Sequence, residues 1–428
     1  MISINRTRSF HPEPGEPDHH FRLKMKIRLK HFKKYPAQFW FLLAGTLIFT
    51  TGSSLVWPFL SICIQGRLGL PLRYSTLLIS IRSFSGVFAS FFFAGSFADR
   101  FGRRFLILSS LLGGAVYYTG LHFSGTLWQF AILMAFWGML DIFYPVGINA
   151  MVADIVADKD RLEAYSLLRI VYNAGYAVGP IIGGILAARS YGLIFTIAAG
   201  GYIVSLLFLA FFTKETLAKS PVDRKVEKTD RLGFLVVLRD RNFILAVFLM
   251  GLIYITSSGV FNLLSFYAGQ NFAIPENEIS YVFTVNAAMC VFFQLPVIQL
   301  VKGQKPVKLM AIAGFLYMTG VCSIIFVDKV WWYCLCMAVM TCGELIMTPT
   351  MSEIAADLAP VNARGRYMSV LSLARPFGQG IGPALLGYVY DTISPRMMWV
   401  CGAVFAGISC VVFSLMGHSG NGIGNSDK

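Results

Sequence analysis

The sequence predicts an all-α membrane protein whose twelve transmembrane helices form two parallel-repeat six-helix bundles. Of the 428 residues, 56% are hydrophobic and 14% are charged, whereas a soluble domain carries about 25% charged residues. The apolar residues lie in runs of about 20 residues or more, and they do not alternate as barrel strands do. The segment 153–184 recurs without a gap as 356–387, 203 positions later. Long apolar runs and a half-length repeat together predict this fold class.

Apolar windows separated by short polar loops define the twelve expected spans. They are 38–64, 74–97, 104–123, 127–153, 164–187, 192–212, 243–267, 279–301, 308–327, 331–356, 366–389 and 396–416. A parallel duplication requires an even number of spans, and the longest polar insertion separates two sets of six. The predicted parts are a basic tail (1–37), an N-terminal half (38–212), a linker (213–242), a C-terminal half (243–416) and a C-terminal tail (417–428).

Lys and Arg residues predict the orientation in the membrane. The N-terminal tail and alternate loops hold most of the 36 Lys and Arg residues, whereas the opposite loops hold few, such as Arg67 and Arg189. Positive loops stay in the cytoplasm, so both termini are expected there, in a multi-pass protein of a bacterial cytoplasmic membrane. The net charge of +14 is explained by this topology and by anionic membrane lipid, and does not require nucleic acid as a partner.

The repeat pairs two acids that lie inside apolar runs, Asp141 and Glu344. Nine residues keep their identity across it: Ala153, Asp154, Arg161, Ser166, Leu168, Gly175, Gly179, Pro180 and Gly184 recur as Ala356, Asp357, Arg364, Ser369, Leu371, Gly378, Gly382, Pro383 and Gly387. Two parallel halves with a matched acid in each are the plan of a secondary transporter whose site lies between the halves.

The loop after the second span carries a specific pattern of charged residues and glycines. Its members are Gly95, Asp99, Arg100, Gly102, Arg103 and Arg104. An ordinary positive-inside loop would explain the arginines but not the whole spacing. Here the chain resembles the major facilitator superfamily, whose Gly-x-x-x-Asp-Arg-x-Gly-Arg-Arg motif it matches, and the resemblance covers about residues 36 to 416. The resemblance implies the major facilitator fold and a latch between the cytoplasmic ends of the halves in the outward-open state.

Glycines and a proline in the fifth span form a second motif, repeated in the eleventh. The two sets are Gly175, Gly179, Pro180, Gly183 and Gly184, then Gly378, Gly382, Pro383 and Gly387. Close helix packing alone is one explanation, because glycines at four-residue spacing clear a helix face. The Gly-Pro-x-x-Gly-Gly run also resembles the antiporter motif of superfamily exporters, which favours efflux over uptake.

Five charged residues lie at membrane depth and are the candidates for substrate binding or proton coupling: Arg82, Asp141, Arg169, Glu344 and Arg375. Each costs ~2.5–3.5 kcal/mol in hydrocarbon, so each is expected to face a cavity or a partner. One hypothesis is that Asp141, Glu344 or both exchange protons. The alternative is fixed pairing of Asp141 with Arg82 and of Glu344 with Arg375. The stretch 134–138 lacks the arginine that drug:proton antiporters usually carry in the fourth span.

Aromatic and amide side chains near these charges and near the Trp57-Pro58 bend are further candidates for the cavity wall. They are Trp57, Phe143, Tyr144, Tyr172, Asn149, Phe261, Asn262 and Asn286. Aromatic rings can stack on a lipophilic ligand, and amides can donate hydrogen bonds to it. Aromatic side chains at helical spacing are more often in the core or against lipid, which is the alternative for this set.

Motifs for other functions are missing from the sequence. It contains neither a GxxxxGK[ST] phosphate loop nor an HExxH metal motif, so we expect no enzyme, no metal and no cofactor beyond a proton gradient. The expected function is proton-coupled efflux of small amphiphilic compounds by alternating access. A proton-coupled uptake symporter for one metabolite and a non-transporting receptor or lipid-handling protein are the alternatives. The expected partners are a small-molecule substrate, protons and membrane lipid, and the expected state is a monomer.

Overall fold

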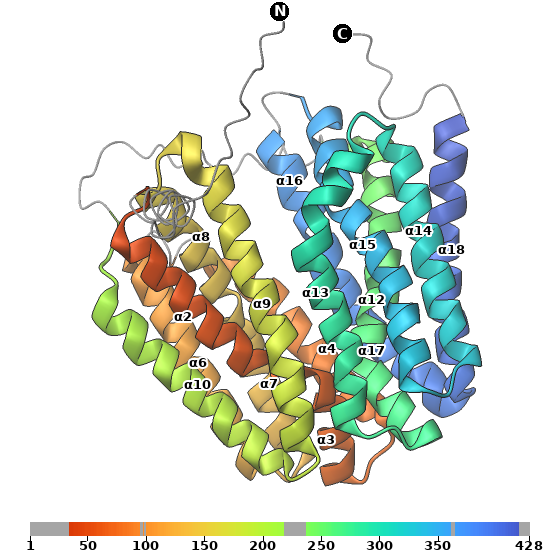
Figure 1. Ribbon diagram of the computed structural model, residues 1–428, viewed down its shortest axis with the longest axis horizontal. Helices are drawn as coiled ribbons and strands as arrows, with labels where there is room; N and C mark the ends of the chain where they lie inside the picture. Colours follow the sequence, from red (N-terminus) through yellow and green to blue (C-terminus); the bar gives the residue numbers. More distant parts are fainter. Residues whose placement is uncertain (1–33, 95–96, 98–99, 218–236, 361–363, 419–428) are drawn as a thin grey trace, which may run out of the picture.

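The computed structural model describes residues 34–94, 97, 100–217, 237–360 and 364–418. Most of the basic tail, the linker and the C-terminal tail expected from the sequence therefore lie outside the described residues. The described residues form helices and loops, with no strand among them. Figure 1 shows the helices in two groups that lie side by side, one from each half of the sequence. The all-α fold of two six-helix halves is confirmed.

The long helices described in the N-terminal half form six consecutive spans. They are α2 (Ala37–Ser54) continued by α3 (Leu60–Leu68), then α4 (Leu72–Ala89), α6 (Arg103–Phe123), α7 (Leu127–Asp141) continued by α8 (Phe143–Ile155), α9 (Arg161–Ala187) and α10 (Tyr191–Phe212). The C-terminal half contains α12 (Arg241–Phe272), α13 (Glu276–Val301), α14 (Pro306–Ser323), α15 (Val330–Leu358), α16 (Arg364–Ser372) continued by α17 (Ala374–Thr392), and α18 (Pro395–His418).

Three of these spans are interrupted, and a proline explains each interruption. Helix α7 ends at Asp141, four residues before Pro145, and α16 ends at Ser372, four residues before Pro376. Likewise α2 ends at Ser54, four residues before Pro58. A proline has no N–H to donate to the carbonyl four residues earlier, and its ring crowds that carbonyl. One of the two matched acids therefore sits at a break in its helix.

Eleven spans within the described residues are long and apolar enough to cross a membrane. They correspond to every expected span except the eleventh, 366–389. That span is divided between α16 and α17, and α17 carries Arg375, Gln379 and Asp391. Helix α17 packs between α12 of its own half and α4 of the other half. Its polar residues are tolerated because protein neighbours cover much of this helix.

The sequence repeat is also a repeat in space. Ser54 Oγ on α2 donates a hydrogen bond to the carbonyl of Gly175 on α9, at 3.0 Å. In the other half, Ser258 Oγ on α12 donates to the carbonyl of Gly378 on α17, at 3.1 Å. The same pair of helices therefore meets through the same contact in both halves.

The repeated glycines allow close helix contact of two kinds. A Cβ on Gly179 would lie 1.7 Å from Ser54 Oγ, and one on Gly382 would lie 2.0 Å from Ser258 Oγ, so these glycines serve packing within each half. A Cβ on Gly184 would instead lie 2.6 Å from the carbonyl oxygen of Glu276, in the other half. The last glycine of each motif thus serves contact between the halves, since Gly387 likewise faces Thr76 Oγ1. Pro180 and Pro383 lie inside their helices.

The two halves meet through α9 with α13 and through α4 with α17. In Figure 1 the two groups of helices are close at the lower end and diverge toward the end where α2 begins and α18 ends. Several hydrogen bonds join the halves near that lower end. They run from Ser61 Oγ to the carbonyl of Asn262 (2.7 Å), from Tyr191 Oη to Glu276 Oε1 (2.5 Å), and from the N–H of Arg73 to Asp391 Oδ2 (2.7 Å).

Candidate functional site

Asp141 forms an ion pair with Arg82 inside the N-terminal half. Arg82 Nη2 on α4 donates to Asp141 Oδ2 at the end of α7, at 2.6 Å, and both side chains are partly buried. A Cβ on Gly138 would lie only 2.1 Å from the carbonyl oxygen of Arg82, so this glycine lets α7 approach α4. Fixed pairing with Arg82 was the alternative to proton exchange, and the structure shows this pairing for Asp141.

Glu344, the matched acid on α15, has a neutral partner instead. Asn286 on α13 donates from Nδ2 to Glu344 Oε2 at 2.9 Å, and also to Thr341 Oγ1 at 2.9 Å. Asn286 is buried, and its two hydrogen bonds hold the amide between Glu344 and Thr341. The structure shows no ion pair between Glu344 and Arg375 among the described residues. Asn286, expected in the cavity wall, instead positions the acid.

Arg169 on α9 reaches across to the C-terminal half. Its Nη2 donates to Gln294 Oε1 on α13 at 2.8 Å, and Gln294 in turn donates to the carbonyl of Leu345 at 3.2 Å. Gln294 is buried, and its amide has no charge to neutralise the arginine. Arg169 therefore contacts the other half through a neutral partner, and the described residues form no ion pair with it.

Arg375 near the start of α17 is the least restrained of the five charged residues. Its side chain is exposed, and no residue that the structure describes forms a hydrogen bond or ion pair with it. Tyr254 on α12 lies within electrostatic range of Arg375, Glu344 and Arg169 together. These three charged groups therefore lie in the same region of the protein.

Trp57 and Phe261 form an aromatic contact between the halves. Their ring centroids are 5.4 Å apart, and Phe283 lies at the same distance from Trp57 on another side. Asn262, next to Phe261 in the chain, accepts the hydrogen bond from Ser61. These expected cavity residues lie at the closed end of the interface, where they join the halves.

The other expected cavity residues differ in exposure. Tyr144 is fully buried, lies 3.0 Å from Thr46 Oγ1 and stacks on Phe49. Phe143 is also buried, against Phe97. The structure thus places both rings in the packing of the N-terminal half, because that face of α8 turns toward its neighbours.

Two polar candidates remain outside that packing. Asn149 is exposed, and its carbonyl accepts a hydrogen bond from Tyr165. Tyr172 is partly exposed, but its hydroxyl is buried without a hydrogen-bond partner among the described residues. Neither side chain joins the charged residues through a direct contact that the structure describes.

The loop motif is held within the N-terminal half. Gly95 and Asp99 lie outside the described residues. Gly102 has φ of +94°, and a Cβ there would lie 2.3 Å from Glu215 Oε2. Only glycine suits this position, because the backbone is left-handed and the carboxylate fills the space of a side chain.

Glu215, which follows α10, caps the first turn of α6. It accepts hydrogen bonds from the N–H groups of Arg103 and Arg104, each at 3.0 Å. Burial raises the pKa of the Glu215 carboxyl, but bonds from four backbone N–H groups outweigh it and leave this pKa below its usual value. A lowered pKa stabilises the folded loop at neutral pH, and this contribution is lost as the pH falls through that pKa.

The arginines of the loop also contact their own half or the loop itself. Arg103 Nε lies 3.1 Å from Asp154 Oδ2, and the Arg104 guanidinium donates to the carbonyl of Ala210. Arg100 is exposed and lies over the ring of Phe101. Within the described residues, these contacts do not form the expected latch to the other half. The latch is not formed because the two halves lie apart at this end of the molecule.

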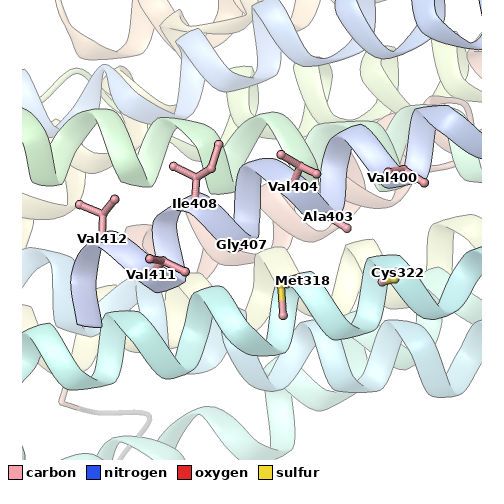
Figure 2. Close-up of a pocket in the computed structure, with 9 residues that line it drawn as sticks. All are labelled: Met318, Cys322, Val400, Ala403, Val404, Gly407, Ile408, Val411 and Val412. Atoms are coloured by element: carbon pink, nitrogen blue, oxygen red, sulfur yellow. The ribbon is translucent and has the colours of Figure 1, made fainter. Parts of the chain in front are cut away.

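A groove of 580 Å³ lies on the outer face between α14 and α18. Figure 2 shows its lining, which comprises Met318, Cys322, Val400, Ala403, Val404, Gly407, Ile408, Val411 and Val412. The lining has no charged residue, and the exposed valines along α18 would face hydrocarbon in a membrane. This groove therefore suits a lipid chain and is separate from the charged residues between the halves. No group of three metal-ligating side chains occurs within the described ranges.

Comparison with protein families decides the classification. The family model described as Major Facilitator Superfamily matches residues 42–271 and 247–419. The chain belongs to the major facilitator superfamily. Membership in this superfamily makes the protein a membrane transporter, and the resemblance drawn from the loop motif is confirmed.

Superfamily members with curated names match over most of their length. An uncharacterized transporter of Bacillus subtilis, YqjV, is 24% identical over 89% of this chain and 93% of its own. A Na⁺, Li⁺, K⁺/H⁺ antiporter of Planococcus maritimus is 24% identical over 80% of this chain and 87% of its own. The multidrug resistance protein MdtH of Klebsiella pneumoniae is 25% identical over 84% and 89%.

Solved structures of other transporters share the fold. The crystal structure of the nucleoside transporter NupG superimposes with a TM-score of 0.78 at 12% identity, covering 88% of this chain and 99% of that one. At this identity the likeness shows the architecture and nothing of the substrate.

Four residues of the site were not singled out by sequence reasoning: Tyr254, Phe283, Gln294 and Glu215. Gln294 lies eight residues after Asn286, so two amides at helical spacing in one apolar span were the available signal. Glu215 is one of many charges in the polar insertion, and no local pattern relates it to the first turn of α6. Its role follows only from the packing of α10 beside α6.

Proposed function

We propose that this superfamily member exports small amphiphilic compounds in exchange for protons, by alternating access between its two halves. The observation that carries the proposal is the unequal partnering of the matched acids. Protonating Asp141 would leave Arg82 without its counter-ion. Protonating Glu344 leaves a neutral carboxyl beside the neutral amide of Asn286, and the hydrogen bond can persist. Glu344 is therefore the proposed proton carrier, and Asp141 with Arg82 a structural pair.

The names of two relatives support this direction and coupling. One relative is called a cation/H⁺ antiporter and another a multidrug resistance protein. The Gly-Pro motif, typical of superfamily exporters, points the same way. The two relatives are 24% and 25% identical to this chain. Antiport and drug export are therefore a proposal for this protein.

The membrane arrangement forms part of the proposal. Both termini lie in the cytoplasm of a bacterial cell, because Lys and Arg are concentrated in the tail and alternate loops. The diverging ends of the two halves then face the cytoplasm, and the closed end faces outward. A monomer suffices, since the site lies between the two halves of one chain, and the proton gradient is the energy source. The groove between α14 and α18 contacts membrane lipid.

The test replaces each acid by its amide in the full chain, reconstituted in liposomes. We expect Glu344→Gln to reduce transport driven by a pH gradient at least tenfold, while exchange of substrate across the membrane without a gradient continues. Asp141→Asn should impair both activities, because it disturbs the pairing with Arg82. Glu278→Gln, at the outer start of α13, is the matched control and should leave both unchanged. Undiminished gradient-driven transport in Glu344→Gln would refute Glu344 as the proton carrier, and undiminished transport in Asp141→Asn as well would refute proton coupling through either acid.

A further inference from the structure

The positive and negative charges of the five charged residues at membrane depth are not balanced. Asp141 is neutralised by Arg82, which leaves Arg169, Arg375 and Glu344. Arg169 is hydrogen bonded to the neutral Gln294, so its charge remains. Since two arginines face one acid, the site carries an excess positive charge.

Glu344 does not remove the charge of Arg375 by direct pairing. Its Oε2 accepts from Asn286, and the structure describes no hydrogen bond between Glu344 and Arg375. Among the described residues, Arg375 has neither a hydrogen-bond partner nor an ion-pair partner, and its side chain is exposed. A guanidinium group at membrane depth is costly unless water or an anion accompanies it.

The packing of α17 places Arg375 at the interface between the halves. Gly378, one turn further on, packs against Tyr254 on α12. Gln379 accepts a hydrogen bond from Ser83 on α4, in the other half, at 3.4 Å. Tyr176 on α9, also in the other half, is 37% exposed and lies within electrostatic range of Arg375. Residues of both halves therefore lie near this arginine, as expected for a substrate site between the halves.

We propose that the transported compounds carry an oxyanion, such as a carboxylate or a phosphate, which binds Arg375 between the halves. The planar guanidinium offers two parallel N–H groups to such a group, and both charges gain from pairing away from bulk water. Tyr254 and Tyr176, one from each half, both lie within electrostatic range of this arginine. Arg169 contributes a second positive charge. This inference rests on the proposed transport function and narrows its substrate to organic anions and zwitterions.

The experiment compares two probes with the same aromatic body. Dansylglycine carries a carboxylate, and dansyl-ethylenediamine carries an ammonium group. Binding of each to the purified full chain in nanodiscs is followed by dansyl fluorescence, with no gradient present. We expect the wild-type chain to bind dansylglycine at least tenfold more tightly than the ammonium probe.

Variants of Arg375 test whether this residue carries the selectivity. Arg375→Gln should weaken dansylglycine binding at least tenfold and leave the ammonium probe unaffected or better bound. Arg375→Lys should retain part of the affinity, because it keeps the charge but loses the planar fork. Arg189→Gln, an exposed arginine outside the site, is the matched control and should behave as wild type. A circular dichroism spectrum and a single elution peak for each variant exclude misfolding.

The remaining outcomes separate this inference from the proposed function. Equal binding of dansylglycine by wild type and Arg375→Gln, or a wild-type preference for the ammonium probe, would overturn the anion site. If either result were accompanied by gradient-driven export of the ammonium probe, the proposed efflux function would still hold. Conversely, Arg375-dependent binding of dansylglycine without any gradient-driven flux in liposomes would keep the anion site and refute proton-coupled export.

Discussion

At the scale of single residues, chemically similar residues acquire different roles from their partners. Asp141 has a cationic partner and Glu344 a neutral one, although the repeat makes them equivalent. Gly102 and Gly303 lie just before the third span of each half and have φ of +94° and +79°. A side chain at Gly102 would meet Glu215, whereas nothing lies within 4 Å of a Cβ on Gly303.

This difference makes Gly303→Ala a natural control for Gly102→Ala. Both substitutions strain a left-handed backbone, which costs roughly 1–2 kcal/mol. Gly102→Ala should also displace Glu215 and remove its cap from α6, a further ~0.5–2 kcal/mol. We expect the thermal unfolding midpoint in detergent to fall clearly more for Gly102→Ala than for Gly303→Ala. Equal shifts would show that the Glu215 cap does not stabilise the folded chain.

At the scale of helices, the first and fifth spans of each half meet through one glycine and one leucine. The glycine lies on the fifth span in the N-terminal half and on the first span in the C-terminal half. In the N-terminal half, Gly183 on α9 lies against the backbone of Leu55, the residue after the end of α2, and a Cβ on Gly183 would lie 2.2 Å from the Leu55 carbonyl oxygen. In the C-terminal half, the leucine is Leu386 on α17 and the glycine is Gly259 on α12. There a Cβ would lie 2.3 Å from the end of the Leu386 side chain.

The two glycines should therefore tolerate alanine differently. Gly259→Ala can be accommodated by rotation of the flexible Leu386 side chain, whereas Gly183→Ala pushes directly on backbone atoms. We expect Gly183→Ala to lower the thermal unfolding midpoint and the yield of folded protein, and Gly259→Ala to have a small effect. The comparison is made on both variants in one detergent. A larger fall in the unfolding midpoint for Gly259→Ala than for Gly183→Ala would contradict this explanation. It would show that the contact of Gly183 with the Leu55 backbone does not set the distance between the two spans.

At the scale of the whole molecule, contacts at one end hold the halves together while the other ends diverge. Asp391 at the end of α17 accepts N–H bonds from Leu72 and Arg73 at the start of α4, in the other half. A carboxylate at a helix N-terminus satisfies donors that have no partner within the helix. Tyr191 and Glu276 add a second bond between the halves at this end.

Loss of this cap should shift the population toward the arrangement that is open at the outer end. In the variant Asp391→Ala, spin labels at Gly125 and Met397 are expected to show a larger fraction of long distances than in the otherwise unchanged chain. Both label positions are exposed and lie in different halves. Asp328→Ala, an exposed acid in the α14–α15 loop, serves as control. Unchanged distances in Asp391→Ala would show that the cap does not determine which end is closed.

The sequence by itself determined the spans, the division into two repeated halves and the residues that carry charge at membrane depth. These properties are local, because a span depends on the length and polarity of one segment and a repeat can be read along the chain. Even the break beside Asp141 follows from Pro145, four residues later. The eleventh span was predicted as well, from an apolar window, and the repeat supported the count of six spans in each half.

Only the tertiary structure decided which charges meet. Pairing depends on the rotation and tilt of each helix against its neighbours, and residues far apart in sequence carry no local sign of it. This is why Arg82 is bound to Asp141 while Arg375 is not bound to Glu344, and why a neutral residue, Gln294, holds Arg169. For the same reason Tyr144 lies in the packed interior, although its position near Asp141 in the chain suggested the cavity wall.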